Sequence, residues 1–263
     1  MELGIIGGGV VGKATARCFL EWANVKVYDV DKSRATHTLE EVLQSDLVFI
    51  CLPTPQTQHK QCMDTTYLDR FFKDDTTPRH RNYVIRSTVP IGYTRRIAYM
   101  GYPSVVHNPE FLTARTSLTD ILIPARHIIG GTFNQAALDL AKLYGRRFPG
   151  VPIFHVSSEV SEFAKLLTNV LFATKISILN EANTLAEKLD VNWQQLMDCV
   201  LSDGRITHSH TQVPGPDGRY GFGGACLPKD VACFYATLLA NNLPASVTEA
   251  VLKRNEHDRE RPV

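Results

Sequence analysis

The sequence lacks the features of several protein classes. No apolar run reaches the roughly 20 residues of a membrane-spanning helix, and Met1-Glu2 leads directly into an expected strand instead of a signal peptide. The formal net charge is only +1, and no basic run is interleaved with aromatic residues. Neither nucleic acid nor a membrane is therefore an expected partner, and we expect a cytoplasmic protein.

The cysteines give no sign of a metal site. The six of them, at positions 18, 51, 62, 199, 226 and 233, form no CxxC pair and no ligand-like spacing with the nine histidines. Neither zinc nor a disulfide framework is indicated, and reduced thiols are the default.

The 263 residues, 44% of them hydrophobic and 21% charged, are enough for one large domain or two modest ones.

A glycine-rich turn follows the first apolar run. Leu3 to Ile6 leads into Gly7-Gly8-Gly9-Val10-Val11-Gly12, which has G-x-G-x-x-G spacing, and a helical pattern comes next. Gly7 permits a tight turn, Gly9 lets backbone amides approach a pyrophosphate, and Gly12 lets helix and strand pack closely. This order of elements is that of a dinucleotide site, although the glycines alone are equally compatible with a simple turn.

An acidic residue completes the dinucleotide pattern. Asp29 lies at the end of the expected strand 25–30, about 20 residues past the glycines, where a carboxylate can accept both ribose hydroxyls. Because an acid there repels a 2′-phosphate, the sequence predicts NAD instead of NADP. The nearby Arg34 either stacks on the adenine or remains solvated.

Three later strands are expected to bring polar residues to one edge of a sheet. The runs 46–52, 83–86 and 104–107 precede Pro53-Thr54-Pro55, Ser87-Thr88-Val89-Pro90 and Asn108-Pro109-Glu110-Phe111-Leu112. Ligands bind at the carboxyl ends of strands in open α/β sheets. With a strand at 126–131, a helix at 135–146 and a strand at 151–156, the alternation predicts a Rossmann-like, doubly wound parallel sheet over residues 1–156.

From Ser157 onward the pattern is helical, which predicts a second, mostly helical domain over residues 157–263. Ser158 is the expected N-cap of one long central helix, 158–189, without proline or glycine. It places Lys165 and Asn169 on one face, although a lysine in an apolar stripe usually extends to solvent, and that alternative stays open. Helices are also expected at 193–201, 229–241 and 245–255, with a loop at 203–220.

The stretch Gly221 to Asp230 reads Gly-Phe-Gly-Gly-Ala-Cys-Leu-Pro-Lys-Asp and places Cys226 near the start of an expected helix. Helix amides and a nearby cation favour the thiolate, which is the nucleophilic form of cysteine. A free cysteine is more often buried and inert. Taken alone, the stretch therefore favours a buried, unreactive Cys226.

Taken together, these pieces resemble the UDP-glucose/GDP-mannose dehydrogenase family over nearly the whole chain. The N-P-E-F-L and G-F-G-G-x-C-x-x-K-D motifs are together highly specific, whereas the glycine turn is common to many folds. The matching pieces are Gly7 to Gly12, Asp29, Pro53-Thr54-Pro55, Ser87-Thr88-Val89-Pro90, Asn108 to Leu112, Glu162 to Lys165, Asn169, Lys175, Asn180, Glu181 and Gly221 to Asp230.

The resemblance implies two successive NAD-dependent oxidations that convert the C6 alcohol of a nucleotide sugar to a carboxylate. Cys226 would attack the C6 aldehyde to form a thiohemiacetal, and a second hydride transfer would give a thioester that water hydrolyses. The other implied catalytic roles are oxyanion stabilisation by Lys165 and Asn169, positioning or activation of water by Asp230 and Thr88, and general-base assistance by Glu110.

The resemblance also implies binding residues and a homodimer formed through the helix 158–189. The implied NAD-binding residues are Gly7, Gly9, Val10, Val11, Gly12, Asp29, Arg34, Leu52, Thr54 and Thr88. The implied substrate-binding residues are Glu110, Phe111, Leu112, Lys165, Asn169, Phe222, Gly223 and Arg205, the last of which would reach the sugar nucleotide of a neighbouring subunit.

The sequence departs from the family pattern in three places. Thr113-Ala114-Arg115 follows N-P-E-F-L where the family usually has Glu-Gly, so one acid near the pocket is expected to be missing, and the segment between Asp29 and Asp46 is short. The family's second Rossmann-like domain, which holds the nucleotide, is also expected to be absent after Asn255-Glu256. Three interpretations of the missing domain stay open: a minimal enzyme, one part of a split enzyme, or a shortened form. The choice between UDP and GDP as the nucleotide also stays open.

Two other functions stay open. A 6-phosphogluconate or β-hydroxyacid type dehydrogenase combines a similar Rossmann domain with a lysine and an asparagine on a long helix. It would transfer one hydride and would not need Cys226. The third candidate is an NAD-binding sensor or scaffold without turnover. Two NADH per sugar would be the signature of the cysteine mechanism.

Overall fold

The computed structural model describes residues 1–57, 62–113 and 115–262. Their contacts divide the chain into two compact units. The first unit contains Met1–Thr54 and Asp64–Lys165, and the second contains Pro55–Met63 and Leu166–Val263. The chain therefore passes from one unit to the other three times, the last time inside a helix.

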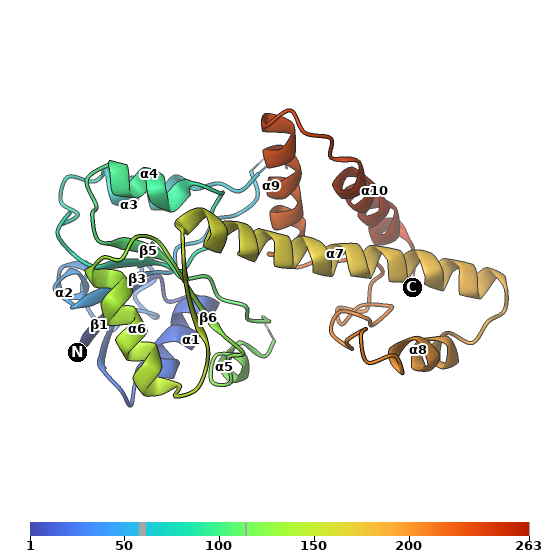
Figure 1. The fold of residues 1–263 in the computed structure, drawn as a ribbon, viewed down its shortest axis with the longest axis horizontal. Helices are drawn as coiled ribbons and strands as arrows, with labels where there is room; N and C mark the ends of the chain where they lie inside the picture. The colour runs from blue at the N-terminus through green and yellow to red at the C-terminus, as the bar shows by residue number, and fades with distance from the viewer. Residues whose placement is uncertain (58–61, 114, 263) are drawn as a thin grey trace. The chain divides into compact units, whose positions relative to one another are not determined.

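A seven-stranded sheet forms the centre of the first unit (Figure 1). The strand order confirms the predicted Rossmann-like fold, but the prediction that the sheet is parallel throughout is wrong, because β6 pairs antiparallel with β5. All the other neighbouring pairs are parallel. In spatial order the strands are β2 (Asn24–Tyr28), β1 (Glu2–Ile6), β3 (Leu47–Ile50), β4 (Tyr83–Ile85), β5 (Val105–His107), β6 (His127–Gly130) and β7 (Ile153–Val156).

The reversal at β6 follows from the connection before it. A parallel neighbour requires a crossover that returns the chain to the edge where the previous strand began. Within the described part of residues 108–126, the only helix is the four-residue α5 (Ser117–Asp120), which packs on α1 (Val10–Phe19). The chain therefore enters β6 from the edge at which β5 ended.

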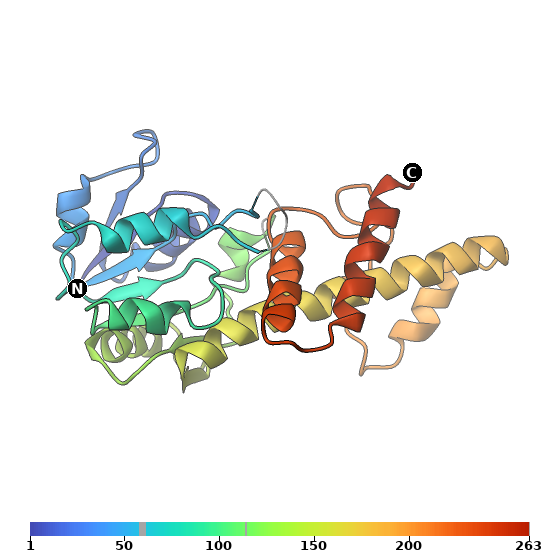
Figure 2. The same cartoon turned by 90° about the horizontal axis from the view of Figure 1, so that it is seen from above.

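Helices cover both faces of the sheet, as Figures 1 and 2 show. Successive strand residues point to opposite faces, so Leu47 and Phe49 join one apolar cluster while Val48 and Ile50 join the other. One cluster includes residues of α1 and α6 (Gln135–Arg147). The other includes residues of α2 (Leu39–Leu43), α3 (Thr66–Lys73) and α4 (Tyr93–Tyr99).

The second unit is helical, and its helices confirm the predicted long central helix. This helix, α7 (Ser158–Lys188), has 31 residues. The predicted N-cap is one residue too late, because Ser158 is already helical and Ser157 Oγ accepts the Val160 N–H at 3.3 Å. The helices that follow are α8 (Trp193–Leu201), α9 (Leu227–Ala240) and α10 (Ser246–Glu260).

A small apolar core holds the second unit together. Val170 and Ala173 of α7 pack against Phe222, Val231 and Val251, and Figure 2 shows α9 and α10 crossing α7. Among the described residues, no helix is long and apolar enough to cross a membrane. The core thus fixes α9, which begins at the cysteine motif, against the central helix.

Candidate active site

The glycine turn between β1 and α1 is closely packed at two of its three motif positions. Gly7 has a φ of +101°, and a Cβ there would lie 2.5 Å from the Cys51 carbonyl oxygen. A Cβ on Gly12 would lie 1.8 Å from the Gly7 carbonyl oxygen. Gly9, the N-cap of α1, has no atom within 4 Å of the Cβ position. Space is therefore left at the helix N-terminus, where a phosphate group fits.

Asp29 follows β2 and is bonded to this turn. Its Oδ2 accepts the Gly8 N–H at 2.6 Å, and its Oδ1 accepts the Asp31 N–H at 2.8 Å. Each carboxylate oxygen retains further acceptor capacity, which suits ribose hydroxyls. Arg34 lies against the turn, since a Cβ on Gly8 would be 2.9 Å from its Cβ. The predicted NAD-binding Val10 and Val11 occupy the first turn of α1.

Hydroxyl groups brace the ends of β3 and β4. Thr54 Oγ1 donates to the Thr88 carbonyl oxygen at 2.8 Å, and Ser87 Oγ donates to the Leu52 carbonyl oxygen at 2.6 Å. The predicted NAD-binding residues Leu52, Thr54 and Thr88 therefore lie together at the carboxyl edge of the sheet. This edge is the ligand-binding side of an open α/β sheet.

A buried ion pair follows β5. Glu110 Oε1 lies 3.2 Å from Lys165 Nζ, and Glu110 Oε2 accepts the Leu112 N–H at 2.6 Å. Lys165 is 4% exposed and Glu110 is 8% exposed, and the centroid of the Phe111 ring is 5.3 Å from Lys165 Nζ. Lys165 does not extend to solvent. The structure therefore brings together four predicted substrate-binding and catalytic residues within the first unit: Glu110, Phe111, Leu112 and Lys165.

Asn108 is held by two residues, Arg86 and Tyr144, that no sequence motif singled out. Its Oδ1 accepts from the Tyr144 hydroxyl at 2.6 Å and from Arg86 Nη1, while its Nδ2 donates to the Ile128 carbonyl oxygen at 2.7 Å. Arg86 and Tyr144 are both buried. These bonds fix the start of the turn that carries Glu110. Arg86 directly precedes the expected Ser-Thr-Val-Pro segment, but no motif assigned it a role.

A second buried cluster lies in the second unit, around Asp230. Its carboxylate is fully buried, with Oδ2 accepting from Asn169 Nδ2 at 2.5 Å and Oδ1 accepting from Lys229 Nζ at 2.6 Å. Asn169 and Asp230, predicted separately and 61 residues apart, therefore meet. Lys229 had not been given a role, although its place beside Asp230 in the motif was a signal.

Cys226 is exposed at the N-terminus of α9, so the buried thiol favoured by the isolated motif is not observed. The Asp230 N–H donates to the Cys226 carbonyl oxygen at 3.0 Å in the first helical turn. Helix N-termini favour negative charge. The geometry is thus suited to a thiolate one turn before the buried Asp230.

Two asparagines position the loop before Cys226. Asn180 Oδ1 accepts the Gly221 N–H at 3.0 Å, and Asn255 Oδ1 accepts the Phe222 N–H at 2.6 Å. A Cβ on the neighbouring Gly223 would lie 2.4 Å from Arg259 Nη2, so a side chain there would require the Arg259 guanidinium to shift. Asn180 belongs to the sequence motifs that match the family, whereas no motif singled out Asn255.

Arg205 lies apart from these clusters. It is exposed, and its guanidinium pairs with Asp203 in the same loop at 2.5 Å. Its predicted reach to the substrate of a neighbouring subunit stays a prediction.

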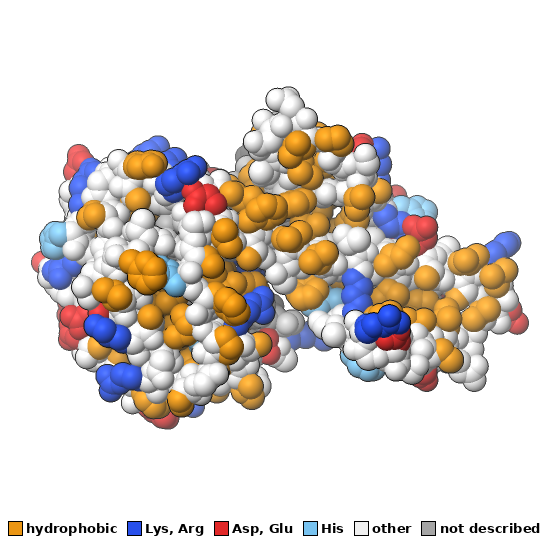
Figure 3. All heavy atoms as spheres, viewed as in Figure 1, with side chains coloured by type: hydrophobic (Ala, Val, Ile, Leu, Met, Phe, Trp, Pro, Cys, Tyr) orange, Lys and Arg blue, Asp and Glu red, His pale blue; other side chains and the backbone are white. Residues whose placement is uncertain are grey.

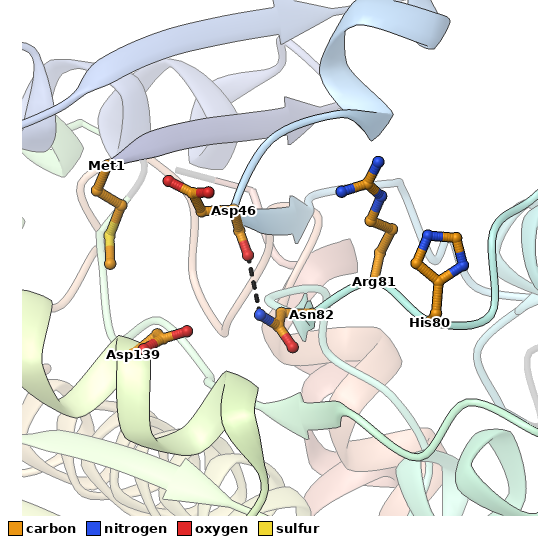
Figure 4. A pocket seen from close by; sticks show the side chains of 6 residues that line it. All are labelled: Met1, Asp46, His80, Arg81, Asn82 and Asp139. Atoms are coloured by element: carbon orange, nitrogen blue, oxygen red, sulfur yellow. Dashed lines mark hydrogen bonds between the residues drawn. The ribbon is translucent and has the colours of Figure 1, made fainter.

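A cavity of about 340 Å³ lies at the other edge of the sheet (Figure 4). Asn82 Nδ2 donates to the Asp46 carbonyl oxygen at 3.0 Å across it. Several of its residues directly precede strands, so this is the amino edge, and dinucleotides bind at the carboxyl edge. The residues that line the cavity are Met1, Asp46, His80, Arg81, Asn82 and Asp139.

An open glycine turn at a helix N-terminus, an acid after β2 and a polar carboxyl edge define a Rossmann-type dinucleotide-binding protein. Within that class, the chain belongs to the UDP-glucose/GDP-mannose dehydrogenase family. The profile of the family's NAD binding domain matches residues 32–147, and that of its central domain matches residues 159–257. The inferred resemblance is confirmed, and the first unit carries the family's NAD-binding domain.

Individual relatives agree with this assignment. UDP-glucose 6-dehydrogenase of Campylobacter jejuni is 32% identical over 237 residues, which are 88% of this chain and 58% of the relative. A solved UDP-glucose dehydrogenase from Pyrobaculum islandicum is 28% identical with a TM-score of 0.83, and 97% of this chain and 68% of that chain are covered. This chain therefore spans less than two thirds of the length of the Campylobacter enzyme and 68% of the solved chain.

One structural neighbour comes from another group. A solved 3-hydroxyisobutyrate dehydrogenase from Mycobacterium tuberculosis has a TM-score of 0.74 at 19% identity, and 96% of this chain and 91% of that chain are covered. At this identity the likeness shows a shared fold.

Proposed function

We propose that this chain oxidises the C6 alcohol of a nucleotide sugar to a carboxylate, in two NAD-dependent steps, through a thioester on Cys226. The observation that carries the proposal is the exposed Cys226 at the N-terminus of α9, one turn before a buried Asp230 bonded to Asn169 and Lys229. Membership of the family supports the reaction class. UDP-glucose and GDP-mannose are the first substrates to test.

The thiol is required because an aldehyde carbon has no readily removed hydride until a nucleophile adds to it. Bound NAD supplies the hydride acceptor for both oxidations. Cys226 forms a carbon–sulfur bond to the aldehyde, and the carbonyl π electrons move to oxygen. The second oxidation leaves a thioester, and water cleaves the carbon–sulfur bond to release the carboxylate and restore the thiol.

Lys165 and Asn169 stabilise the oxyanion in this proposal. They are one turn apart on α7, and each is buried and already bonded to a carboxylate, Lys165 to Glu110 and Asn169 to Asp230. Donors that are held in place before the reaction lose little energy to reorganisation when charge develops on oxygen. Glu110 serves as general base for thioester hydrolysis, and Asp230 and Thr88 position the water.

The deciding experiment measures NADH formed per sugar oxidised, with UDP-glucose and GDP-mannose in parallel. Two NADH per sugar are expected. Cys226→Ser should stop at the aldehyde stage after one NADH, while Cys199→Ser, which removes another exposed thiol, should keep the full yield. No turnover of either substrate by folded protein that binds NAD would reject the proposal and favour an NAD-binding protein without turnover.

The rival is a single-step dehydrogenase of the β-hydroxyacid type. The observation in its favour is that Lys165 and Asn169 lie one turn apart on the long helix α7, a pair that a single hydride transfer can use without a thiol. Full activity of Cys226→Ser with a β-hydroxyacid would favour it, because a single hydride transfer from an alcohol needs no thiol.

We also propose that the protein is a homodimer formed through α7. Hydrophobic side chains recur along this helix every three, four or seven residues, each between 40% and 60% exposed, and Figure 3 shows hydrophobic side chains over α7. A second copy with the same stripe would bury them. The residues are Val160, Phe163, Leu167, Leu171, Ile178 and Leu185.

The cytoplasmic location stays a prediction.

A further inference from the structure

The N-terminal end of α7 is bonded directly to the sheet of the first unit. Ser161 Oγ and His107 Nδ1 are hydrogen-bonded at 2.8 Å, and His107 is the last residue of β5. A Cβ on Gly130, the last residue of β6, would lie 2.2 Å from Ser161 Cβ. Ser161 and His107 are both fully buried. This end of the helix therefore packs closely against the ends of β5 and β6.

Glu162, the next residue, bonds the same end of α7 to α4. Its Oε2 accepts the Gly92 N–H at 2.6 Å, and its Oε1 accepts the Thr94 N–H at 2.8 Å. These amides belong to the N-terminus of α4, where backbone N–H groups have no partner within the helix. Glu162 is fully buried, and a buried carboxylate is costly unless it is hydrogen-bonded. The two bonds therefore stabilise both the carboxylate and the start of α4.

Glu162 lies between two parts of the proposed active site. It is three residues before Lys165, so less than one helical turn separates it from the lysine that pairs with Glu110. Gly92, the N-cap of α4, ends the segment that follows β4, and this segment carries Thr88. A shift of the Glu162 carboxylate would therefore change how Lys165 and Thr88 are placed relative to each other.

We propose that Glu162 is a positioning residue, which fastens the turn of α7 that carries Lys165 to the segment that carries Thr88. Glu162 does not touch the reacting atoms in this proposal. It holds the oxyanion donor and the water-positioning hydroxyl at a fixed spacing before substrate binds, which reduces the reorganisation required when charge develops. The expected effect on turnover rests on the proposed function, whereas the fastening itself does not.

The first test measures hydrogen exchange of backbone amides by mass spectrometry in Glu162→Gln at about pH 7.5. Burial raises the pKa of Glu162 to about 6, so the unsubstituted side chain is ionised at that pH. Glutamine has nearly the same shape but only one acceptor oxygen, so one of the two amides loses its bond. The peptide that contains Gly92 and Thr94 should exchange severalfold faster, while peptides of α6 stay unchanged. Unchanged exchange of the α4 peptide would overturn the fastening.

Glu159→Gln is the matched control. It removes the same charge from the same helix, and the partner of Glu159, Arg95 at 2.8 Å, also lies on α4. Because ion pairs near the surface contribute little, exchange at the start of α4 should stay as in the unsubstituted protein. Equal acceleration in both variants would overturn the specific role of Glu162. Should Glu162→Gln fail to fold, Glu162→Asp, which keeps the charge and shortens the side chain, replaces it with the same expectation.

The second test determines whether the fastening reaches Lys165. The proteins are treated with acetic anhydride, and acetylated peptides are quantified by mass spectrometry. Lys165 is buried and paired with Glu110, so it should react slowly in the unsubstituted protein and severalfold faster in Glu162→Gln. Lys229, which is also buried but lies in the second unit, should react alike in both proteins, which excludes general unfolding. Equal rates at Lys165 would overturn its positioning by Glu162.

The effect on turnover is measured on the same samples. In Glu162→Gln, kcat should fall by about tenfold with little change in KM, because a misplaced donor slows the reaction more than it weakens binding. Glu159→Gln should keep the full kcat. An unchanged kcat in Glu162→Gln with accelerated exchange would overturn the positioning role. If no preparation turns over a nucleotide sugar, the proposed function fails, while exchange and acetylation still decide whether Glu162 fastens the two segments.

Discussion

At the residue scale, the described part of the site buries charge only in bonded groups. Lys165 is paired with Glu110 in the first unit, and Asp230 is paired with Lys229 and bonded to Asn169 in the second. Removing one partner of a buried pair costs about 3–5 kcal/mol, because the other charge is left uncompensated. Substitutions at these positions therefore affect stability as well as chemistry, and the two effects must be measured separately.

Lys165→Met tests the oxyanion role of the lysine. It keeps a side chain of similar length and removes the charge, so kcat should fall by about 10²–10³ with a smaller change in KM. Lys142→Met, at an exposed surface pair, should leave kcat unchanged. Urea unfolding shows how much of each sample is folded. An unchanged kcat in folded Lys165→Met would contradict the oxyanion role.

His107 makes stability depend on pH. Burial, with the nearby Lys165 and Arg86 cations, lowers its pKa to about 3. Because the folded pKa lies below the ordinary value of about 6.5, the unfolded state binds more protons between them, and stability is lost as pH falls through this window. From about pH 7 to about pH 5, we expect a loss of about 2 kcal/mol from His107.

Urea unfolding at the two pH values measures this loss, and His107→Asn should show a weaker pH dependence than the unsubstituted protein. Burial also lowers the pKa of His127, to about 4, so part of the pH dependence should remain in the variant. Identical pH dependence in both proteins would contradict the role of His107.

At the scale of elements, the glycines of the turn between β1 and α1 have two different roles. Two are needed for packing, and the third leaves space for a ligand. Gly7 and Gly12 are required by contacts within the protein, whereas a Cβ on Gly9 would meet no protein atom within 4 Å. The middle glycine therefore serves no packing purpose in the structure. Its place at the N-terminus of α1 is where a pyrophosphate would need close approach to backbone amides.

Gly9→Ala should accordingly leave the melting temperature nearly unchanged and weaken NAD binding by at least about tenfold, since a methyl group would occupy the space of the phosphate. Calorimetric titration with NAD measures the affinity without relying on turnover. Gly145→Ala, on α6 and equally free of close contacts, is the matched control. Equal NAD affinity in Gly9→Ala would contradict the assigned pyrophosphate site.

The elements that the sequence predicted are those with local signals. The long helix was predicted from an uninterrupted apolar pattern, and α8 was predicted with its observed bounds. Helix α4 was missed because its first amides are bonded to Glu162, 68 to 70 residues further along the chain. The direction of β6 was wrong because it depends on the path of a connection and not on the composition of the strand.

The predicted site residues also have local sequence signals, whereas the missed ones depend on contacts between distant segments. Motif spacing was enough to single out Cys226, Asp230 and Asn169, because each belongs to a short, specific pattern. Arg86 and Asn255 were missed, since each contributes a hydrogen bond to a segment remote in sequence. Such bonds depend on the folded path of the chain, which no local pattern records.

At the scale of the whole molecule, the exposed stripe on α7 is the strongest sign of self-association. The helix is about 46 Å long at 1.5 Å per residue, and its exposed apolar residues extend over most of its length. A monomer would leave this stripe in water, at a cost that rises with the apolar area.

Leu171→Glu combined with Ile178→Glu should convert the dimer to a monomer, because paired copies would bury four like charges. Light scattering after gel filtration measures the mass. Val247→Glu, which changes an exposed apolar residue of α10, should leave the mass unchanged. A dimer that survives the double substitution would move the interface away from α7.

Helix α7 also fixes the spacing along its axis between the two residues proposed as oxyanion donors. Lys165 is the last residue of the first unit in its segment, and Asn169 lies in the second unit, yet one unbroken helical turn joins them. Their separation along the axis, about 6 Å for four residues, is set by helical hydrogen bonds. Backbone hydrogen bonds within one turn of α7 therefore hold the two residues at a fixed spacing along the helix axis before any substrate is bound.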